Sequence, residues 1–128
     1  RSVVTVCFRS AEGGQAREVA DLVCGASGLF FTGGDQSEYF QWWQGPVAAC
    51  INERARAGIP IGGSSAGLAV LGEYLFTALN GGVGSASALA NPYEKEVTLS
   101  QNFLNVGLPL RRVLTDTHFF QRDRMGRL

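Results

Sequence analysis

The sequence has no excess of charge of either sign and no long apolar run. Lysine plus arginine number 11, and aspartate plus glutamate also number 11, so the net charge is zero. A polyanion such as duplex nucleic acid is therefore not an expected partner. No apolar run approaches the roughly 20 residues that a membrane-spanning helix needs, so no membrane partner is expected either. With 128 residues, 45% of them hydrophobic and 17% charged, the chain has the composition of one globular domain.

Histidine and cysteine are too scarce to suggest a common type of metal site. The chain has one histidine and three cysteines, and no two cysteines form a C-x-x-C pair. Such a set is poor for zinc, so the sequence implies no metal and no cofactor. We interpret Cys7, Cys24 and Cys50 as small buried residues of a protein in a reducing compartment.

Strand-like and helix-like segments alternate along the chain. The alternation predicts a three-layer α/β fold, with a mostly parallel sheet that has helices on both faces. The chain starts at Arg1 beside a strand-like run and stops inside a helix-like one, so we expect residues 1–128 to be a single domain that is truncated at both ends. The expected strands are 3–8, 28–32, 59–63 and 113–119; the expected helices are 16–27, 46–57, 66–76 and one from about 122, with 77–96 as a loop.

Polar motifs follow three of the expected strands. The motif FFTGGDQ ends the second strand, PIGGSSAG ends the third and LTDTHF ends the last. The carboxyl ends of parallel strands meet at one edge of the sheet, and ligand sites of α/β folds lie at that edge. The sequence therefore predicts one site that is built from these three motifs.

Residues 63–67, Gly-Ser-Ser-Ala-Gly, fit the pattern G-x-S-x-G, centred on Ser65. This pattern places a nucleophilic serine on a strained strand-to-helix turn, where the residues two before and two after must lack side chains. The N–H of Ala66 is then the natural donor to an oxyanion. A glycine-rich turn with helix-capping serines has the same pattern. Ser64 is an alternative nucleophile, although its flanking glycines are out of register.

A serine nucleophile needs a base, which is usually a histidine. His118 is the one histidine of the chain, and it ends the last expected strand, 53 residues after Ser65. A lone histidine is also common at a surface or in a core without any catalytic role. Asp116 points to the same side of an extended strand as His118, but a carboxylate so near along the strand rarely reaches the far nitrogen of the imidazole.

Four motifs together resemble the cyanophycinase family: FFTGGDQ, PIGGSSAGLAVLGE, ALANPY and LTDTHFFQRDRMGRL. The resemblance runs from about residue 28 to residue 128. It implies a class I glutamine amidotransferase-like fold and a serine peptidase related to aspartyl dipeptidase. It also implies hydrolysis of β-aspartyl peptide bonds, with release of β-Asp-Arg dipeptides from cyanophycin, a polyaspartate that carries an arginine on each side chain.

The resemblance also implies roles for individual residues. Ser65 resembles the nucleophile and His118 the base, while Gly34 and Ala66 resemble the oxyanion donors. The family's triad acid follows the histidine, so it is expected beyond Leu128. The acidic β-aspartyl substrate is expected to contact Gln36, Asp116, Arg122, Arg124 and Arg127.

Several alternatives stay open at this stage. Thr117 stands where stricter cyanophycinases have glutamine, so the substrate could be the polymer or a short isoaspartyl peptide. An α/β-hydrolase esterase shares the G-x-S-x-G turn, and a truncated, non-catalytic amidotransferase-like binding module would bind without turnover. The arginines also suit a solvated helix start, and Gln36 suits a helix cap. Adjacent Trp42 and Trp43 cannot both face one core from a helix, which is compatible with a homodimer.

Overall fold

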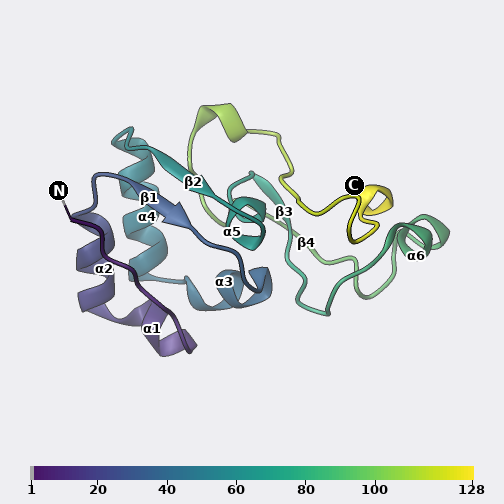
Figure 1. Cartoon of the computed structure of the whole chain (residues 1–128), viewed down its shortest axis with the longest axis horizontal. Helices are drawn as coiled ribbons and strands as arrows, with labels where there is room; N and C mark the ends of the chain where they lie inside the picture. The colour runs from purple at the N-terminus through teal and green to yellow at the C-terminus, as the bar shows by residue number, and fades with distance from the viewer. Residues whose placement is uncertain (1) are drawn as a thin grey trace.

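The computed structural model describes residues 2–128, and it has an elongated α/β architecture (Figure 1). A first strand pair and five helices lie at one end, a second strand pair lies in the middle, and the last helix lies beside the C-terminus at the other end. The predicted α/β class is confirmed. The elements are α1 Ala11–Gln15, α2 Arg17–Cys24, β1 Leu29–Phe31, α3 Gln36–Trp42, α4 Pro46–Arg56, β2 Ile61–Gly63, α5 Ala66–Ala69, β3 Tyr74–Phe76, α6 Ser85–Ala90, β4 Leu99–Gln101 and two 3-10 turns, η1 Leu108–Leu110 and η2 Met125–Arg127.

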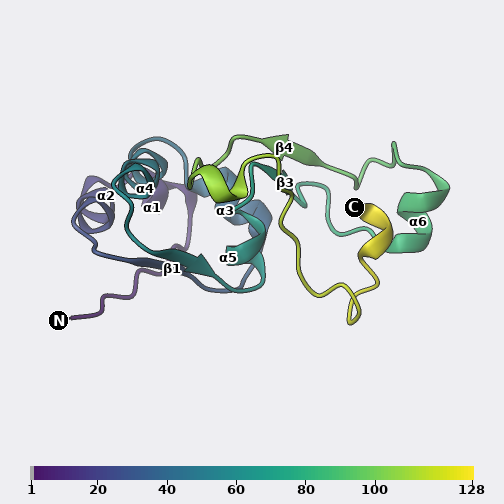
Figure 2. The same ribbon diagram turned by 90° about the horizontal axis from the view of Figure 1, so that it is seen from above.

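The parallel pair β1–β2 carries the first two polar motifs at its carboxyl end. Leu29 pairs with Ile61 and Phe31 with Gly63, so both strands end at the same level. Helices α2 and α4 lie side by side on one face of the pair (Figures 1 and 2). Phe31 is buried toward this side, whereas Phe30 points the other way and is 67% exposed. The fully buried residues of this core include Val47, Ile51, Val70, Leu75 and Leu104.

The helix expected over 66–76 ends at Ala69, and a strand begins at Tyr74 instead. The reason is a close backbone approach at Gly72, where a Cβ would lie only 2.7 Å from the carbonyl oxygen of Val113. A chain this close to another backbone pairs with it rather than winding into a helix. Strand β3 pairs antiparallel with β4, a strand that the sequence did not predict.

Four other expectations about secondary structure are wrong. In place of the helix expected from about residue 122, the structure has only the 3-10 turn η2. Residues 3–8 form no strand, and Val3 is almost fully exposed, because no described strand lies beside them. Residues 113–119 make only an isolated bridge, from Leu114 to Tyr74, and the positive φ of His118 ends the extended run. The expected loop 77–96 contains α6. Within residues 2–128 the strands form two separate pairs, so the three-layer sheet is not observed there.

Trp42 and Trp43 both contact one core, contrary to the expectation. Trp43 lies just beyond α3 with a non-helical backbone, and this turn carries its ring inward. The ring stacks on Tyr39 at 4.5 Å between centroids and is buried. Trp42 packs partly buried against the same cluster. These rings therefore give no argument for a partner subunit, and the homodimer stays a prediction.

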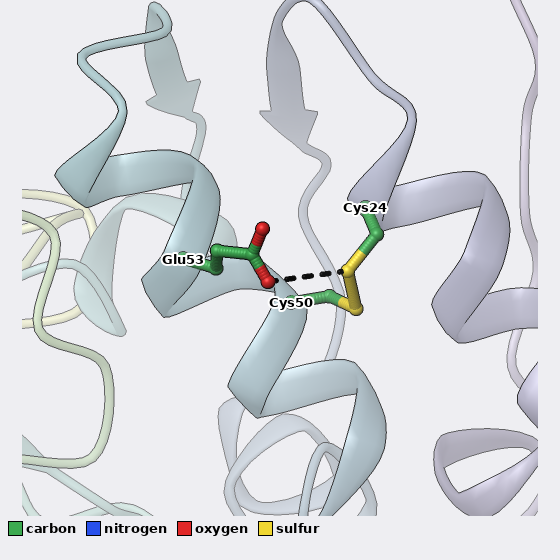
Figure 3. The surroundings of a disulfide bond; sticks show 3 residues. All are labelled: Cys24, Cys50 and Glu53. Carbon is green, nitrogen blue, oxygen red and sulfur yellow. Dashed lines mark hydrogen bonds between the residues drawn. A yellow bond between two sulfur atoms is a disulfide. The ribbon is translucent and has the colours of Figure 1, made fainter.

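The interpretation of the cysteines as reduced is wrong for two of the three. Cys24 at the end of α2 and Cys50 in α4 form a disulfide (Figure 3). The Glu53 carboxylate lies 3.8 Å from the Cys24 sulfur. A disulfide sulfur carries no hydrogen, so this contact is not a hydrogen bond while the bridge is intact. Cys7 is free and exposed. The bridge fixes the two helices that cover the β1–β2 pair.

We expect reduction of this bridge to lower the free energy of unfolding by about 3–4 kcal/mol, because it closes a loop of 26 residues. The double variant Cys24→Ser, Cys50→Ser should show the same loss without reductant. Urea unfolding followed by circular dichroism measures both, with Cys7→Ser as the matched control that should unfold like the parent. Identical midpoints for the oxidised and reduced protein would contradict the expectation.

Candidate active site

Ser65 occupies a strained turn between β2 and α5. Its backbone has φ 51° and ψ −121°, a region that non-glycine residues rarely adopt and that costs about 1–3 kcal/mol. The two flanking glycines are sterically required here. A Cβ on Gly63 would overlap the carbonyl of Gly67, and a Cβ on Gly67 would overlap the carbonyl of Phe31. The turn thus presents the Ser65 side chain at the carboxyl end of the strands.

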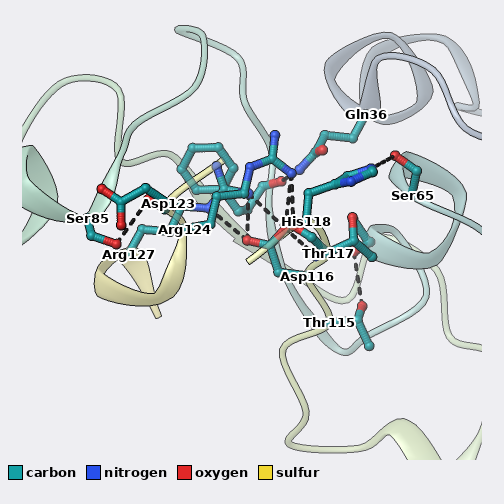
Figure 4. A network of polar contacts seen from close by, with 12 residues as sticks. Gln36, Ser65, Ser85, Thr115, Asp116, Thr117, His118, Asp123, Arg124 and Arg127 are labelled. Carbon is teal, nitrogen blue, oxygen red and sulfur yellow. Dashed lines mark hydrogen bonds and ion pairs between the residues drawn. The ribbon is translucent and has the colours of Figure 1, made fainter. Parts of the chain in front are cut away.

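The structure brings Ser65 and His118 together. Ser65 Oγ lies 2.7 Å from His118 Nε2, and both side chains are half-buried (Figure 4). The Ser65 side chain makes no hydrogen bond to cap α5. Ser64 is exposed beside it. When the imidazole proton is on Nδ1, Nε2 accepts the serine hydroxyl hydrogen, which is the arrangement that activates a serine for nucleophilic attack.

Two backbone N–H groups near this serine are those of Ala66, which follows it directly, and of Gly34, whose neighbour Gly33 lies close to the Ser65 side chain. Within residues 2–128 neither group donates a hydrogen bond, so both are available to an anion. The loop that carries Gly34 is fixed by Tyr39, whose hydroxyl donates to the carbonyls of Thr32 and Gly33 at 3.0 Å each. The sequence did not reveal this contact of Tyr39 with the loop.

Asp116 is the centre of a buried cluster of charges. Its side chain is fully buried and accepts two hydrogen bonds of 2.7 Å from Arg127, one from Nε and one from Nη2. The Thr117 N–H also donates to it at 2.7 Å, and Arg124 Nη1 lies 3.7 Å away. Arg127 is 1% exposed and stacks 4.0 Å above the Phe76 ring. The Asp116 carboxylate is therefore held by arginines and makes no hydrogen bond to the His118 ring.

This cluster has more positive than negative charge. Burial lowers the pKa of Arg124, the charge of Arg127 lowers it further, and Asp116 only partly offsets both effects. Arg122 is exposed nearby. A cation in such surroundings favours an anionic ligand, because the ligand supplies the missing negative charge.

A cavity of about 260 Å³ lies against this positive cluster. Of the predicted substrate-contacting residues, Gln36, Arg122, Arg124 and Arg127 line it, whereas Asp116 lies behind Arg127. Gln36 is buried, and its Nε2 donates to the Phe76 carbonyl at 2.5 Å. Gly34 also lines the cavity, and its neighbour Gly33 lies close to the Ser65 side chain, although Ser65 and His118 are not among the lining residues.

A second cavity of about 470 Å³ lies elsewhere, around Glu73, Asn105 and Arg111, and contains none of the predicted residues.

Among residues 2–128 there is no cluster of three or more His, Cys, Asp or Glu side chains placed to hold a metal ion. In the same range no helix has the length and apolar character to cross a membrane.

Three curated proteins named cyanophycinase are similar to the chain over most of its length. Those of Trichormus variabilis and of a Nostoc species are each 34% identical to it over 123 residues, which are 94% of the chain and 38% of the relative. That of Geminocystis herdmanii is 29% identical over 117 residues, or 90% of the chain and 39% of the relative. The chain thus spans about two fifths of the length of these relatives. No protein-family model matches it.

Proposed function

We infer from this similarity that the chain, which is cyanophycinase-like over 94% of its length, carries part of the active site of a serine peptidase that acts on β-aspartyl substrates. The contact of 2.7 Å between Ser65 and His118 is the observation that carries the proposal. The substrate would be cyanophycin or a short isoaspartyl peptide.

The proposed reaction uses the residues around Ser65. The serine oxygen attacks the carbonyl carbon of the scissile amide while His118 takes its proton. In cyanophycin the scissile amide joins two aspartyl residues of the backbone, so the β-Asp-Arg bond stays intact. In a short isoaspartyl peptide it is the β-linked amide itself. The N–H groups of Gly34 and Ala66 donate to the oxyanion that forms. Collapse of this intermediate breaks the C–N bond, and His118 gives the proton to the leaving amine. A water molecule then hydrolyses the acyl-enzyme with the same base, which frees Ser65.

The positive cavity fits a feature that distinguishes β-aspartyl substrates. In a short isoaspartyl peptide the β-linked aspartyl residue keeps a free α-carboxylate, and in cyanophycin each side-chain-linked arginine does. Arginine side chains of a protein bind carboxylates through paired hydrogen bonds. Arg127 already pairs with Asp116, so we propose that Arg122 and Arg124 bind the substrate carboxylate. Asp116 acts from behind by holding Arg127.

We also propose that β1 and β2 belong to the larger parallel sheet of a three-layer, amidotransferase-like domain. Their shared carboxyl edge carries Gly34 and Ser65, as this architecture requires. The bare side of the pair, where Phe30 is exposed, would be covered by further elements of such a domain.

Two substrates test the proposed function. We expect the protein to release β-Asp-Arg from cyanophycin, or to cleave a short β-aspartyl dipeptide, and the faster of the two identifies the substrate class. Hydrolysis of a simple ester such as p-nitrophenyl acetate, with no hydrolysis of cyanophycin or of the dipeptide, would favour the esterase instead. Binding of both peptides without turnover by the folded protein would favour a non-catalytic module.

Charge reversal at Arg122 tests the anion site. We expect Arg122→Glu to raise KM for the β-aspartyl substrate by about 10- to 100-fold, because it replaces a charge-assisted hydrogen bond by repulsion. The matched control is Arg9→Glu, an exposed arginine near the N-terminus that should leave KM unchanged. Steady-state kinetics measures both variants. An unchanged KM in Arg122→Glu would refute the binding role of this arginine.

A further inference from the structure

Thr115 ties the chain segment of His118 to the helix that follows Ser65. Its hydroxyl donates to the carbonyl of Ala69 at 3.1 Å and accepts the N–H of Gly72 at 2.9 Å. Ala69 is the last residue of α5, which begins directly after Ser65. Thr115 lies three residues before His118 and is half-buried (Figure 4). One side chain thus connects the two elements that carry the serine and the histidine.

The two elements pack closely where Thr115 contacts Gly72. A Cβ on Gly72 would lie 2.7 Å from the carbonyl of Val113 and 2.8 Å from Thr115 Oγ1. The absence of a side chain at Gly72 therefore permits the approach, and the Thr115 hydroxyl holds it. Two residues away in each segment, the Tyr74 N–H donates a hydrogen bond of 3.1 Å to the Val113 carbonyl, which supports the same approach.

Nearer to His118 the segment is held by arginines. Asp116 is fixed by Arg127, and Arg124 donates to the carbonyl of Thr117 at 3.0 Å. His118 itself has φ 59°, a conformation that side-chain-bearing residues seldom adopt. A residue in such a conformation keeps it only when its surroundings constrain it. Among these contacts, the one that Thr115 makes with α5 links the His118 segment directly to the helix that follows Ser65.

We propose that Thr115 is a positioning residue for the reaction: its hydroxyl fixes the His118 segment against α5 and so sets the distance between Ser65 and His118. This inference rests on the proposed peptidase function. Thr115 does not line the cavity beside the arginines, so its loss should not weaken substrate binding. A purely structural role would change stability alone.

Thr115→Val tests the proposal, since valine keeps the shape and removes the hydroxyl. We expect kcat to fall about 10- to 100-fold, the effect of a small misplacement of catalytic groups, with KM within about twofold of the parent. Thr115→Ser keeps the hydroxyl and should recover most of kcat. The second-order rate at which a fluorophosphonate labels Ser65 should fall in parallel with kcat, because that reaction needs the Ser65–His118 pair but no peptide site.

Val47→Ala is the matched control for stability. Val47 is a buried residue of α4 and plays no part in the site, so this variant should lower the melting temperature yet keep kcat and labelling per folded molecule. If Thr115→Val is too unstable to purify, Gly72→Ala is the second variant, and it should slow labelling by forcing the two segments apart.

Parent-like kcat and labelling in Thr115→Val, with only a lower melting temperature, would overturn the proposal, as would failure of Thr115→Ser to recover activity. Failure of the proposed function looks different, since the parent protein itself would then neither label nor turn over, and the inference about Thr115 would fall with it.

Discussion

Ser65→Ala is expected to abolish turnover of the β-aspartyl substrate, with a loss of about a millionfold in kcat if Ser65 and His118 act as one unit. The variant removes the oxygen that lies 2.7 Å from His118 Nε2. The fold should be unaffected, because the Ser65 side chain makes no capping bond and alanine is smaller. Steady-state release of β-Asp-Arg, or of aspartate from a dipeptide, measures the loss.

Ser64→Ala is the matched control for this prediction. Ser64 precedes Ser65 in the same turn but is exposed. Its variant should keep kcat within a few-fold of the parent. A parent-like rate in Ser65→Ala, or a loss of activity in Ser64→Ala alone, would contradict the assignment of the nucleophile.

Asp116→Ala is expected to cost about 3–5 kcal/mol in the free energy of unfolding, because it leaves a buried cation without its partner. Arg127 is 1% exposed and would lose both hydrogen bonds to the carboxylate, while Arg124 would lose its nearest negative charge. Urea unfolding measures the cost. The matched control is Glu96→Ala, which removes the surface pair with Lys95 and should cost well under 1 kcal/mol.

A double variant separates the charge effect from lost packing. Asp116→Ala with Arg127→Met removes both members of the pair and should recover part of the stability lost in Asp116→Ala. Equal stability of Asp116→Ala and Glu96→Ala would show that the cluster does not hold the segment before His118 in place.

The local pattern of the sequence predicted the elements whose causes are local. Helices α2 and α4 follow from apolar spacing and, in α4, from Pro46 in the first turn. The pair β1–β2 follows from short apolar runs that end in glycine. The helix over 66–76 was wrong because Gly72 meets a segment about 40 residues away in the chain, and no local pattern contains that contact.

The turn around Ser65 could be predicted from the sequence, because its geometry depends on steric contacts between residues that are neighbours in the chain. The glycines around Ser65 are needed for that turn, so the pattern could be read directly. The contacts of Tyr39 and Thr115 are with backbone groups that only folding brings near them, and neither residue type is unusual at its position. The disulfide was not predicted for the same reason, because Cys24 and Cys50 come together only through the packing of α2 on α4.

We propose that Ser65 is a nucleophile that His118 activates. Labelling of the protein with a fluorophosphonate, followed by peptide mass spectrometry, tests it most directly because it needs no knowledge of the substrate. We expect a single adduct on Ser65 that disappears in His118→Ala. An adduct on Ser64, or labelling that persists unchanged in His118→Ala, would contradict it.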